Sequence, residues 1–191
     1  MTMKNLKTIA LALVVALGTI TANAQDKKIN TAKSKISWVG EKVTGKHEGT
    51  INVKDGSLTF KNNKLTGGNI TVDMNSVAVT DLKAGEGKEK LEGHLKAADF
   101  FGTDKHPTAK IVFKSVKEKS AGVYAVTADL TIKNITKPIT FDLTAGANSA
   151  STTLKVDRTK YDITYKSGSV FDGLGDAAIY DEFTLKVNLQ Y

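Results

Sequence analysis

Apolar and polar residues alternate with a period of two along most of the chain from Ile36 onward. The alternating runs are short and rich in β-branched and aromatic residues, and clusters of Gly, Asn, Asp or Lys separate them. This pattern predicts β-strands joined by hairpin loops. Pro138 is expected to open its strand, after a tight turn at Thr136 and Lys137. The predicted strands are 35–40, 49–53, 56–60, 68–74, 109–113, 122–132, 138–143, 151–156 and 182–191.

One face of the predicted strands is apolar, and the other carries mainly Ser, Thr, Lys, Asp and Asn. Such one-sided alternation is typical of antiparallel sheets that pack one face on a core. A count of about eight to ten strands fits either a sandwich or an up-and-down barrel, so the period alone leaves both open. The apolar face contains Ile36, Trp38, Leu58, Phe60, Ile70, Val72, Met74, Ile111, Phe113, Leu130, Ile132, Ile139, Phe141, Leu143, Phe183, Leu185, Val187 and Leu189.

The segment 81–107 breaks the strand pattern. It begins rich in Gly and charge and then places apolar residues at Leu91, Leu95 and Ala98, a helical spacing, with Gly102 as the expected C-cap. A long insertion between strands is expected to carry function or to cover part of the fold. Its Phe100-Phe101 pair is expected at one end of the sheet structure, either as a plug of the core or as the lining of an entrance for an apolar ligand.

The amino-terminal residues 1–24 have the three parts of a secretory signal peptide. Lys4 and Lys7 precede an uncharged apolar run from Ile9 to Ile20, and the stretch ends in Ala22-Asn23-Ala24. The apolar run is shorter than the roughly 20 residues that span a bilayer. We therefore expect residues 25–191 to form one exported domain, in the periplasm, with secretion beyond the cell left open.

Composition narrows the function classes. The chain has no cysteine, which excludes disulfides, thiolate metal sites and a lipid-anchored cysteine. Two of the 27 basic residues and no acidic residue precede residue 25, so the net charge falls from +7 to +5 without the signal peptide. The charges are interspersed, which argues against a nucleic-acid partner and favours solubility, with a weak attraction to anionic membrane surfaces as a lesser effect.

Signatures of catalysis and metal binding are sparse. The sequence lacks the Gly-x-Ser-x-Gly, His-Glu-x-x-His and phosphate-loop motifs. His47, His94 and His106 have no metal-ligand spacing, and structural roles are favoured for them. The acids at 172, 176, 181 and 182 lie among turn glycines and lack the calcium-loop pattern, so calcium is the weaker reading there. No catalytic residue, metal or cofactor is predicted.

Several motifs together resemble one protein family. They are His94-Leu95-Lys96, Asp99-Phe100-Phe101, Pro107 and the run from Leu130 to Ile139, with Ser76-Val77 closing an earlier strand. They resemble the YceI-like family of periplasmic, lipocalin-like proteins, sometimes described as polyisoprenoid-binding, and the similarity extends in weaker form from Ile36 to Tyr191. The resemblance implies an eight-stranded antiparallel β-barrel, with a short helical segment over one end, around an apolar tunnel that holds an isoprenoid chain.

The chain also departs from the family pattern. Lys42 stands where a histidine is common at the end of the first core strand, and Tyr161-Asp162-Ile163 stands where Phe-Gly-(Leu/Ile) is expected. The stretch 168–182 is longer than usual. These departures leave the ligand's head group and its class open.

Three functions remain in competition. The first is a non-enzymatic carrier or store for a long apolar lipid such as a quinone tail or polyprenyl chain. The second is a periplasmic enzyme or redox helper for a quinone-like head group, with His94, Lys42 or Tyr161 near the mouth. The third is a structural or interaction barrel filled by its own side chains. The oligomeric state, a dimer included, is left open.

The first function has fifteen candidate ligand-binding residues. They are the inward-facing residues of the predicted strands, which form the tunnel wall, together with polar and aromatic residues expected at the mouth. The full set is Trp38, Phe60, Ile70, Val72, Met74, His94, Leu95, Phe100, Phe101, Ile111, Phe113, Leu130, Ile132, Phe141 and Tyr161.

Overall fold

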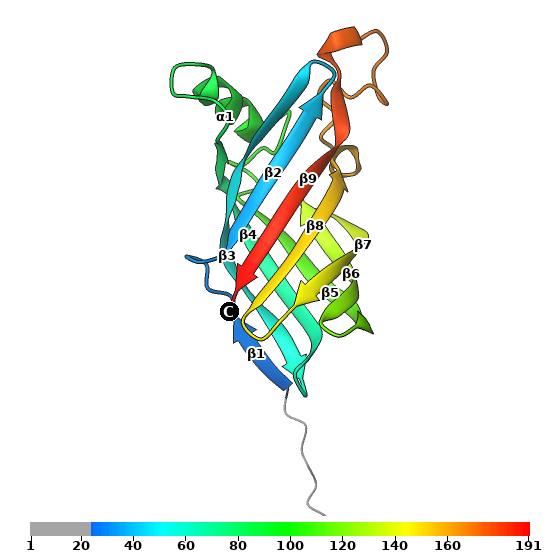
Figure 1. Ribbon diagram of the computed structural model, residues 1–191. Helices are drawn as coiled ribbons and strands as arrows, with labels where there is room; N and C mark the ends of the chain where they lie inside the picture. The colour runs from blue at the N-terminus through cyan, green and yellow to red at the C-terminus, as the bar shows by residue number, and fades with distance from the viewer. Residues whose placement is uncertain (1–23) are drawn as a thin grey trace, which may run out of the picture.

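A computed structural model describes residues 24–191 (Figure 1). Almost all of the predicted signal peptide lies outside the described residues. The fold is mostly sheet, with one short α-helix and two single-turn 3-10 helices. The elements are β1 (Ala24–Lys28), β2 (Lys35–Lys42), β3 (Gly45–Lys61), β4 (Lys64–Val79), α1 (Lys88–Lys96), β5 (Thr108–Ser120), β6 (Val123–Ile132), β7 (Ile135–Ala145), β8 (Ser149–Asp157), η1 (Arg158–Tyr161), η2 (Gly175–Ala177) and β9 (Ile179–Gln190).

The strands close into an antiparallel barrel. The order of neighbours is β3-β2-β9-β8-β7-β6-β5-β4, and β4 pairs back onto β3, so eight strands form a complete ring. The ninth strand, β1, pairs with the lower part of β3, at residues 57–61, while β2 pairs with its upper part, at 45–51. The predicted antiparallel barrel is confirmed, and the sandwich that the period allowed is excluded.

The runs 49–53 and 56–60 were expected to be two strands, and that prediction is wrong. They belong to the single strand β3, whose register against β4 shifts between Val53 and Asp55. Gly56 lies just after the shift at φ 156°, and a Cβ there would come within 2.5 Å of the Asn69 carbonyl oxygen. The glycine therefore permits a bulge and a close approach to β4, not a chain reversal.

Two of the two-residue hairpin turns have positive φ at both residues. Asn62 and Asn63 join β3 to β4, and Lys133 and Asn134 join β6 to β7, all four with positive φ. Positive φ at both central residues is the geometry of a type I′ turn, which matches the twist of the strands. The turn expected before Pro138 is therefore misplaced by several residues, and Pro138 lies within β7.

The predicted helix is present but shorter than expected. α1 ends at Lys96 with Ala97 in extended conformation, and Gly102, at φ 56°, lies in a later turn, so the predicted C-cap is wrong. Glu92 of α1 accepts a hydrogen bond from the Val79 amide of β4 at 2.9 Å, which fixes the helix beside the upper part of the barrel (Figure 1). Within residues 24–191 no helix has the length and apolar character needed to cross a membrane.

Candidate functional site

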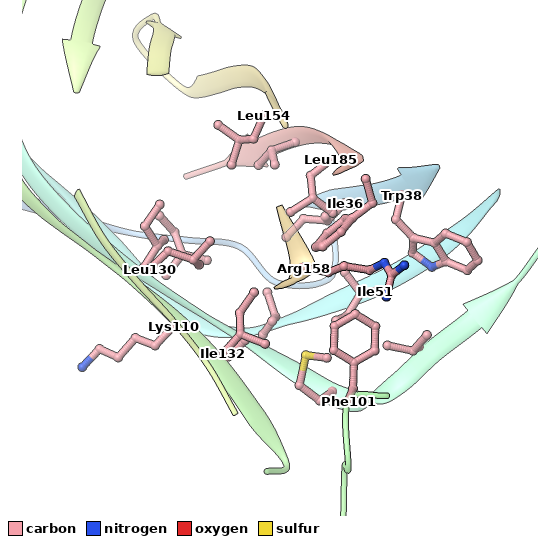
Figure 2. Close-up of a pocket in the computed structure, with 18 of the residues that line it drawn as sticks. Ile36, Trp38, Ile51, Phe101, Lys110, Leu130, Ile132, Leu154, Arg158 and Leu185 are labelled. Carbon is pink, nitrogen blue, oxygen red and sulfur yellow. The ribbon is translucent and has the colours of Figure 1, made fainter. Parts of the chain in front are cut away.

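The barrel encloses an apolar cavity of about 180 Å³ (Figure 2). Its lining residues on β9 run from Ile179 to Leu189, so the cavity follows the strand for roughly 33 Å at the usual rise of a β-strand. The volume exceeds the ~150 Å³ of a dry apolar cavity that holds benzene, so part of a hydrocarbon chain fits without rearrangement. The arrangement is a narrow, elongated apolar chamber.

Several inward-facing side chains are only partly buried. Phe113, Phe141, Phe183 and Leu185 lie on the inner face of the barrel and line the cavity, yet each retains some exposed surface. In a barrel filled by its own side chains, such residues would be close-packed. Their residual exposure reflects the hollow in front of them.

The structure brings most of the candidate binding residues together. Twelve of the fifteen line this one cavity, and they come from five strands and from the stretch of α1 and the turn after it. Leu95 lies on α1, and Phe100 and Phe101 lie in the turn that follows α1. The other nine residues lie on the strands. The twelve are Trp38, Ile70, Val72, Met74, Leu95, Phe100, Phe101, Ile111, Phe113, Leu130, Ile132 and Phe141.

Three candidates lie elsewhere. Phe60 is in the lower part of β3, where its ring packs on Tyr191 with centroids 5.6 Å apart. His94 packs its ring on Phe100 and on Tyr165, at 5.5 Å and 4.4 Å, so it supports the Phe pair from behind. Tyr161, in η1, is 1% exposed and does not line the cavity. Each is a packing residue in this arrangement.

The three residues that the enzyme hypothesis expected near the mouth do not line the cavity. His94 and Tyr161 do not reach the cavity, and Lys42 is exposed at the end of β2, outside the cavity lining. Within residues 24–191 no group of three or more His, Asp or Glu side chains is arranged to hold a metal ion. Asp181, one of the acids considered for calcium, is instead part of a hydrogen-bonded network.

Phe100 and Phe101 together form one wall at the upper end of the cavity. Their rings meet edge to face at 5.2 Å, and Phe101 also meets Phe183 of β9 edge to face at 6.3 Å. Phe100 is 8% exposed, and Phe101 is partly buried. Both residues line the cavity, so the pair bounds an open chamber instead of filling it.

Arg158 is a buried charged residue of the cavity lining that is not among the fifteen candidates. It is the only arginine among 27 basic residues, which is the signal that was available in the sequence. Its side chain is 2% exposed and reaches the same end of the cavity as Trp38 and Phe101 (Figure 2). A buried arginine among apolar residues requires hydrogen-bond partners, because an unpaired buried charge is very costly.

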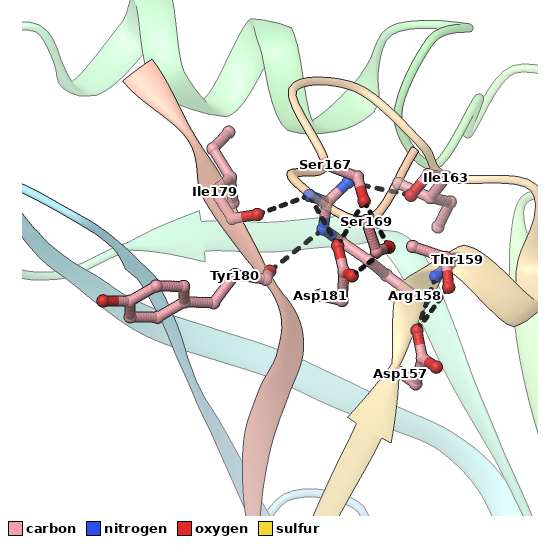
Figure 3. A network of polar contacts seen from close by, with 9 residues as sticks. All are labelled: Asp157, Arg158, Thr159, Ile163, Ser167, Ser169, Ile179, Tyr180 and Asp181. Carbon is pink, nitrogen blue, oxygen red and sulfur yellow. Dashed lines mark hydrogen bonds and ion pairs between the residues drawn. The ribbon is translucent and has the colours of Figure 1, made fainter. Parts of the chain in front are cut away.

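Backbone carbonyls supply those partners (Figure 3). The Arg158 Nε donates to the Tyr180 carbonyl at 3.2 Å, Nη1 to the Ile163 carbonyl at 2.8 Å and Nη2 to the Ile179 carbonyl at 2.9 Å. The β8–β9 ladder ends at the pair Asp157 and Glu182, so the carbonyls of residues 179 and 180 lie beyond it. The guanidinium thus satisfies acceptors at the point where β8 ends.

Asp181 balances the charge of Arg158. The Arg158 Nη2 is 3.6 Å from Asp181 Oδ1, and the hydroxyls of Ser167 and Ser169 donate to the same carboxylate. Burial raises the pKa of Asp181, but the serine hydrogen bonds and Arg158 lower it by more, so it lies below its ordinary value of 3.8. The pair is therefore ionised at neutral pH, and its net charge is close to zero.

Unused donors remain at this end of the cavity. A guanidinium has five N–H groups, and three of those of Arg158 are taken by carbonyls. The indole Nε1 of Trp38 is buried and has no hydrogen-bond partner among residues 24–191. Trp38 packs over Gly49, where a Cβ would come within 2.5 Å of the indole ring. Two side chains that carry N–H groups, Trp38 and Arg158, thus line this end of the cavity.

The lower end of the barrel is closed by aromatic packing. Phe60 and Tyr191 are in contact, and Lys27 Nζ lies 4.8 Å from the Phe60 ring centroid and 5.2 Å from that of Tyr191. The Tyr191 hydroxyl donates to the carbonyls of Gly146 and Ser149, and burial raises the pKa of Tyr191 to about 12. This end is a plug with its polar atoms directed outward.

Comparisons with known proteins agree with this architecture. The family model of the YceI-like domain matches residues 28–191. A UPF0312 protein of Shewanella denitrificans is 36% identical over 77 residues, 40% of this chain and 38% of the relative. A UPF0312 protein of Staphylococcus aureus strain USA300 is 47% identical over 55 residues, 29% of each. The matched stretches thus span less than two fifths of these relatives.

Solved structures share the fold at low sequence identity. BcnA of Burkholderia cenocepacia has a TM-score of 0.69 at 21% identity, over 84% of this chain and 98% of BcnA. A polyisoprenoid-binding domain from Saccharophagus degradans has a TM-score of 0.56 at 15% identity, over 85% of this chain and 95% of that domain. The family match covers residues 28–191 and the barrel agrees with it, so this chain belongs to the YceI-like family.

Proposed function

We propose that this protein binds and carries or stores a long apolar lipid of the isoprenoid type inside its barrel. The observation that supports this is the elongated cavity, whose wall consists almost entirely of apolar side chains. Each buried methylene contributes about 0.8 kcal/mol, so a twenty-carbon chain gains roughly 16 kcal/mol before the costs of association. The polyisoprenoid-binding domain of Saccharophagus degradans, which shares the fold, supports the same ligand class.

The head group belongs at the upper end, beside Arg158 and Trp38. Both residues line the cavity and keep N–H donors that residues 24–191 do not use. Because Asp181 already offsets the charge of Arg158, an anionic head group gains little net attraction there and has to compete with a carboxylate. An uncharged acceptor, such as a quinone carbonyl or an alcohol, suits these donors better.

The proposal includes a place of action, the periplasm, which rests on the signal-peptide pattern of residues 1–24. The first experiment is native mass spectrometry of the protein recovered from the periplasmic fraction of its host, with lipid analysis of an organic extract. We expect a stoichiometric long-chain lipid. If the protein stays ligand-free after incubation with quinones and polyprenyl alcohols, the binding proposal is wrong. If the protein is not found in the periplasmic fraction, the proposed location is wrong.

A matched pair of variants tests the site. Ile111 lines the cavity, whereas its neighbour Val112 does not, and both are β-branched aliphatic residues on β5. Ile111→Trp should occupy the cavity and weaken binding of retinol, a fluorescent isoprenoid alcohol, by roughly tenfold or more, because the added ring takes the volume of the chain. Val112→Trp should leave retinol affinity within about twofold, since its side chain points away from the ligand. Equal effects of the two variants contradict a site in the barrel.

A further inference from the structure

The barrel wall is incomplete between β7 and β8. These strands pair only at Thr144 with Ser151 and at Ala145 with Ala150, whereas β6 and β7 share ten pairs and β8 and β9 share nine. Above the two pairs the strands diverge (Figure 1). We call the facing unpaired stretches, 135–143 of β7 and 152–157 of β8, the seam. Its β8 side extends for roughly 20 Å.

The seam leads into the central cavity. A surface hollow lies along it, with polar residues such as Thr140, Thr153 and Lys155 at its outer rim. Four residues line both this hollow and the central cavity, so the two spaces share these residues as a common wall. They are Phe141, Thr152, Leu154 and Val187.

Both ends of the seam are tied. At the lower end, next to the two strand pairs, the Thr152 hydroxyl donates to the Asp142 carbonyl at 2.6 Å. At the upper end Lys133, in the turn before β7, donates to the Asp162 carbonyl just after η1, at 2.8 Å. The opening is therefore a bounded slot in the wall, and the barrel remains one piece around it.

The sequence of β7 keeps the seam unpaired. Pro138 lies within the unpaired stretch and has no N–H to give to a neighbouring strand. Proline within a sheet is confined to edges of this kind. Each of the other strand interfaces of the barrel holds at least five strand pairs, whose ladder hydrogen bonds are worth about 0.5–1.5 kcal/mol net each. This seam widens without breaking any ladder bond along its unpaired stretch.

We propose that the seam is a lateral portal through which a slender apolar chain enters and leaves the barrel sideways. This inference rests on the proposed function and adds the route that the ligand takes. A long chain fills more volume than the cavity of about 180 Å³ provides, so loading has to move some of the wall. The unpaired stretches are the part of the wall that moves at least cost.

A cross-link across the seam tests the portal, and the absence of native cysteines makes the chemistry specific. Asp142 and Thr153 are exposed residues on its two sides. The folded Asp142→Cys/Thr153→Cys variant is closed with a short bis-maleimide. Retinol binding is followed by energy transfer from Trp38, the single tryptophan, which lines the cavity. We expect association and dissociation to slow by roughly tenfold or more, with the equilibrium affinity nearly unchanged, because a blocked route affects both directions equally.

The control cross-link joins strands that are already paired. Thr153→Cys/Lys186→Cys uses exposed partners on β8 and β9 and should leave both rates unchanged. Unchanged rates in the seam variant overturn the portal while leaving lipid binding intact. Failure of the uncross-linked protein to bind any retinol counts against the proposed function and removes the portal with it.

Amide hydrogen exchange gives a reading that needs no ligand. Amides of residues 152–157 that face the seam should exchange at least about a hundredfold faster than amides in the β8–β9 ladder, because they have no strand partner. Equal protection of the two sets means that the seam is closed in solution, which overturns the portal whatever the result with retinol.

Discussion

The two ends of the barrel are closed in different ways. At the upper end a buried arginine takes three backbone carbonyls and an aspartate. At the lower end Phe60 and Tyr191 pack together, with the Tyr191 hydroxyl and Lys27 directed to surface carbonyls. The polar network lies at the border of the cavity, whereas neither residue of the aromatic plug lines it.

The difference follows from where the strands stop. β8 ends at Asp157 while β9 begins three residues beyond the last pair, which leaves carbonyls that need donors. At the lower end the β8–β9 ladder continues to the pair Ser149 and Gln190, so few backbone groups are left over. Unequal strand lengths thus call for a charged side chain at one end, and equal lengths allow an apolar plug at the other. Arg158, a buried charged residue of the cavity lining, thus lies where the β8–β9 ladder has run out.

The largest predicted effect is at the upper end. Arg158→Met should lower the free energy of unfolding by about 3–5 kcal/mol, because Asp181 and the carbonyls lose their partner in a buried site. Denaturant unfolding measures the change. Lys160→Met, which removes only an exposed ion pair with Asp157, is the control and should cost less than about 0.5 kcal/mol. A loss for Arg158→Met as small as that of the control contradicts a stabilising role for the network.

A smaller effect is expected when a phenylalanine of the lower plug and one of the cavity wall are each replaced by leucine. Phe60→Leu should cost about 1 kcal/mol in stability and leave retinol affinity unchanged, because Phe60 lies outside the cavity. Phe113→Leu is the matched change in the wall, where the ring packs on Phe141 with centroids 5.9 Å apart. It should weaken retinol binding by roughly threefold to tenfold through lost contact area. If Phe60→Leu weakens binding as much, the chamber extends further down than the structure places it.

The smallest effects are in the pH dependence of stability, with opposite signs at the two ends. The pKa of Asp181 lies below 3.8, so its contribution is present above that pH and is lost as the pH falls through the folded pKa. The pKa of Tyr191 is raised from 10.0 to about 12, so its contribution is present below pH 10 and is lost as the pH rises toward 12. Asp181→Asn should flatten the acid limb of thermal unfolding and Tyr191→Phe the alkaline limb. If Asp181→Asn changes the alkaline limb instead, or Tyr191→Phe the acid limb, these two residues are not the source of the pH dependence.

The sequence was informative about faces and about the family. Alternation placed Trp38, Val72 and Phe113 on the inner surface because successive side chains of a strand point to opposite sides. It failed where a residue's height in the barrel decides its role. Phe60 alternates inward like the others, but it lies below the cavity and plugs the lower end. Arg158 was missed because its partners, residues 163 and 179–181, come together only when β8 ends beside β9.

The sequence by itself determined an antiparallel sheet with one apolar face, a helical insertion before β5 and membership of the YceI-like family. Local periodicity and turn residues carry that information. The period left a sandwich and a barrel open, and the closed barrel was predicted through the family resemblance and confirmed by the structure. Only the tertiary structure decided that the interior is hollow and that β7 and β8 leave a seam. These properties depend on strand register, strand length and the volume left between opposite walls. Each of these quantities depends on all the strands of the barrel together, so no local sequence pattern encodes it.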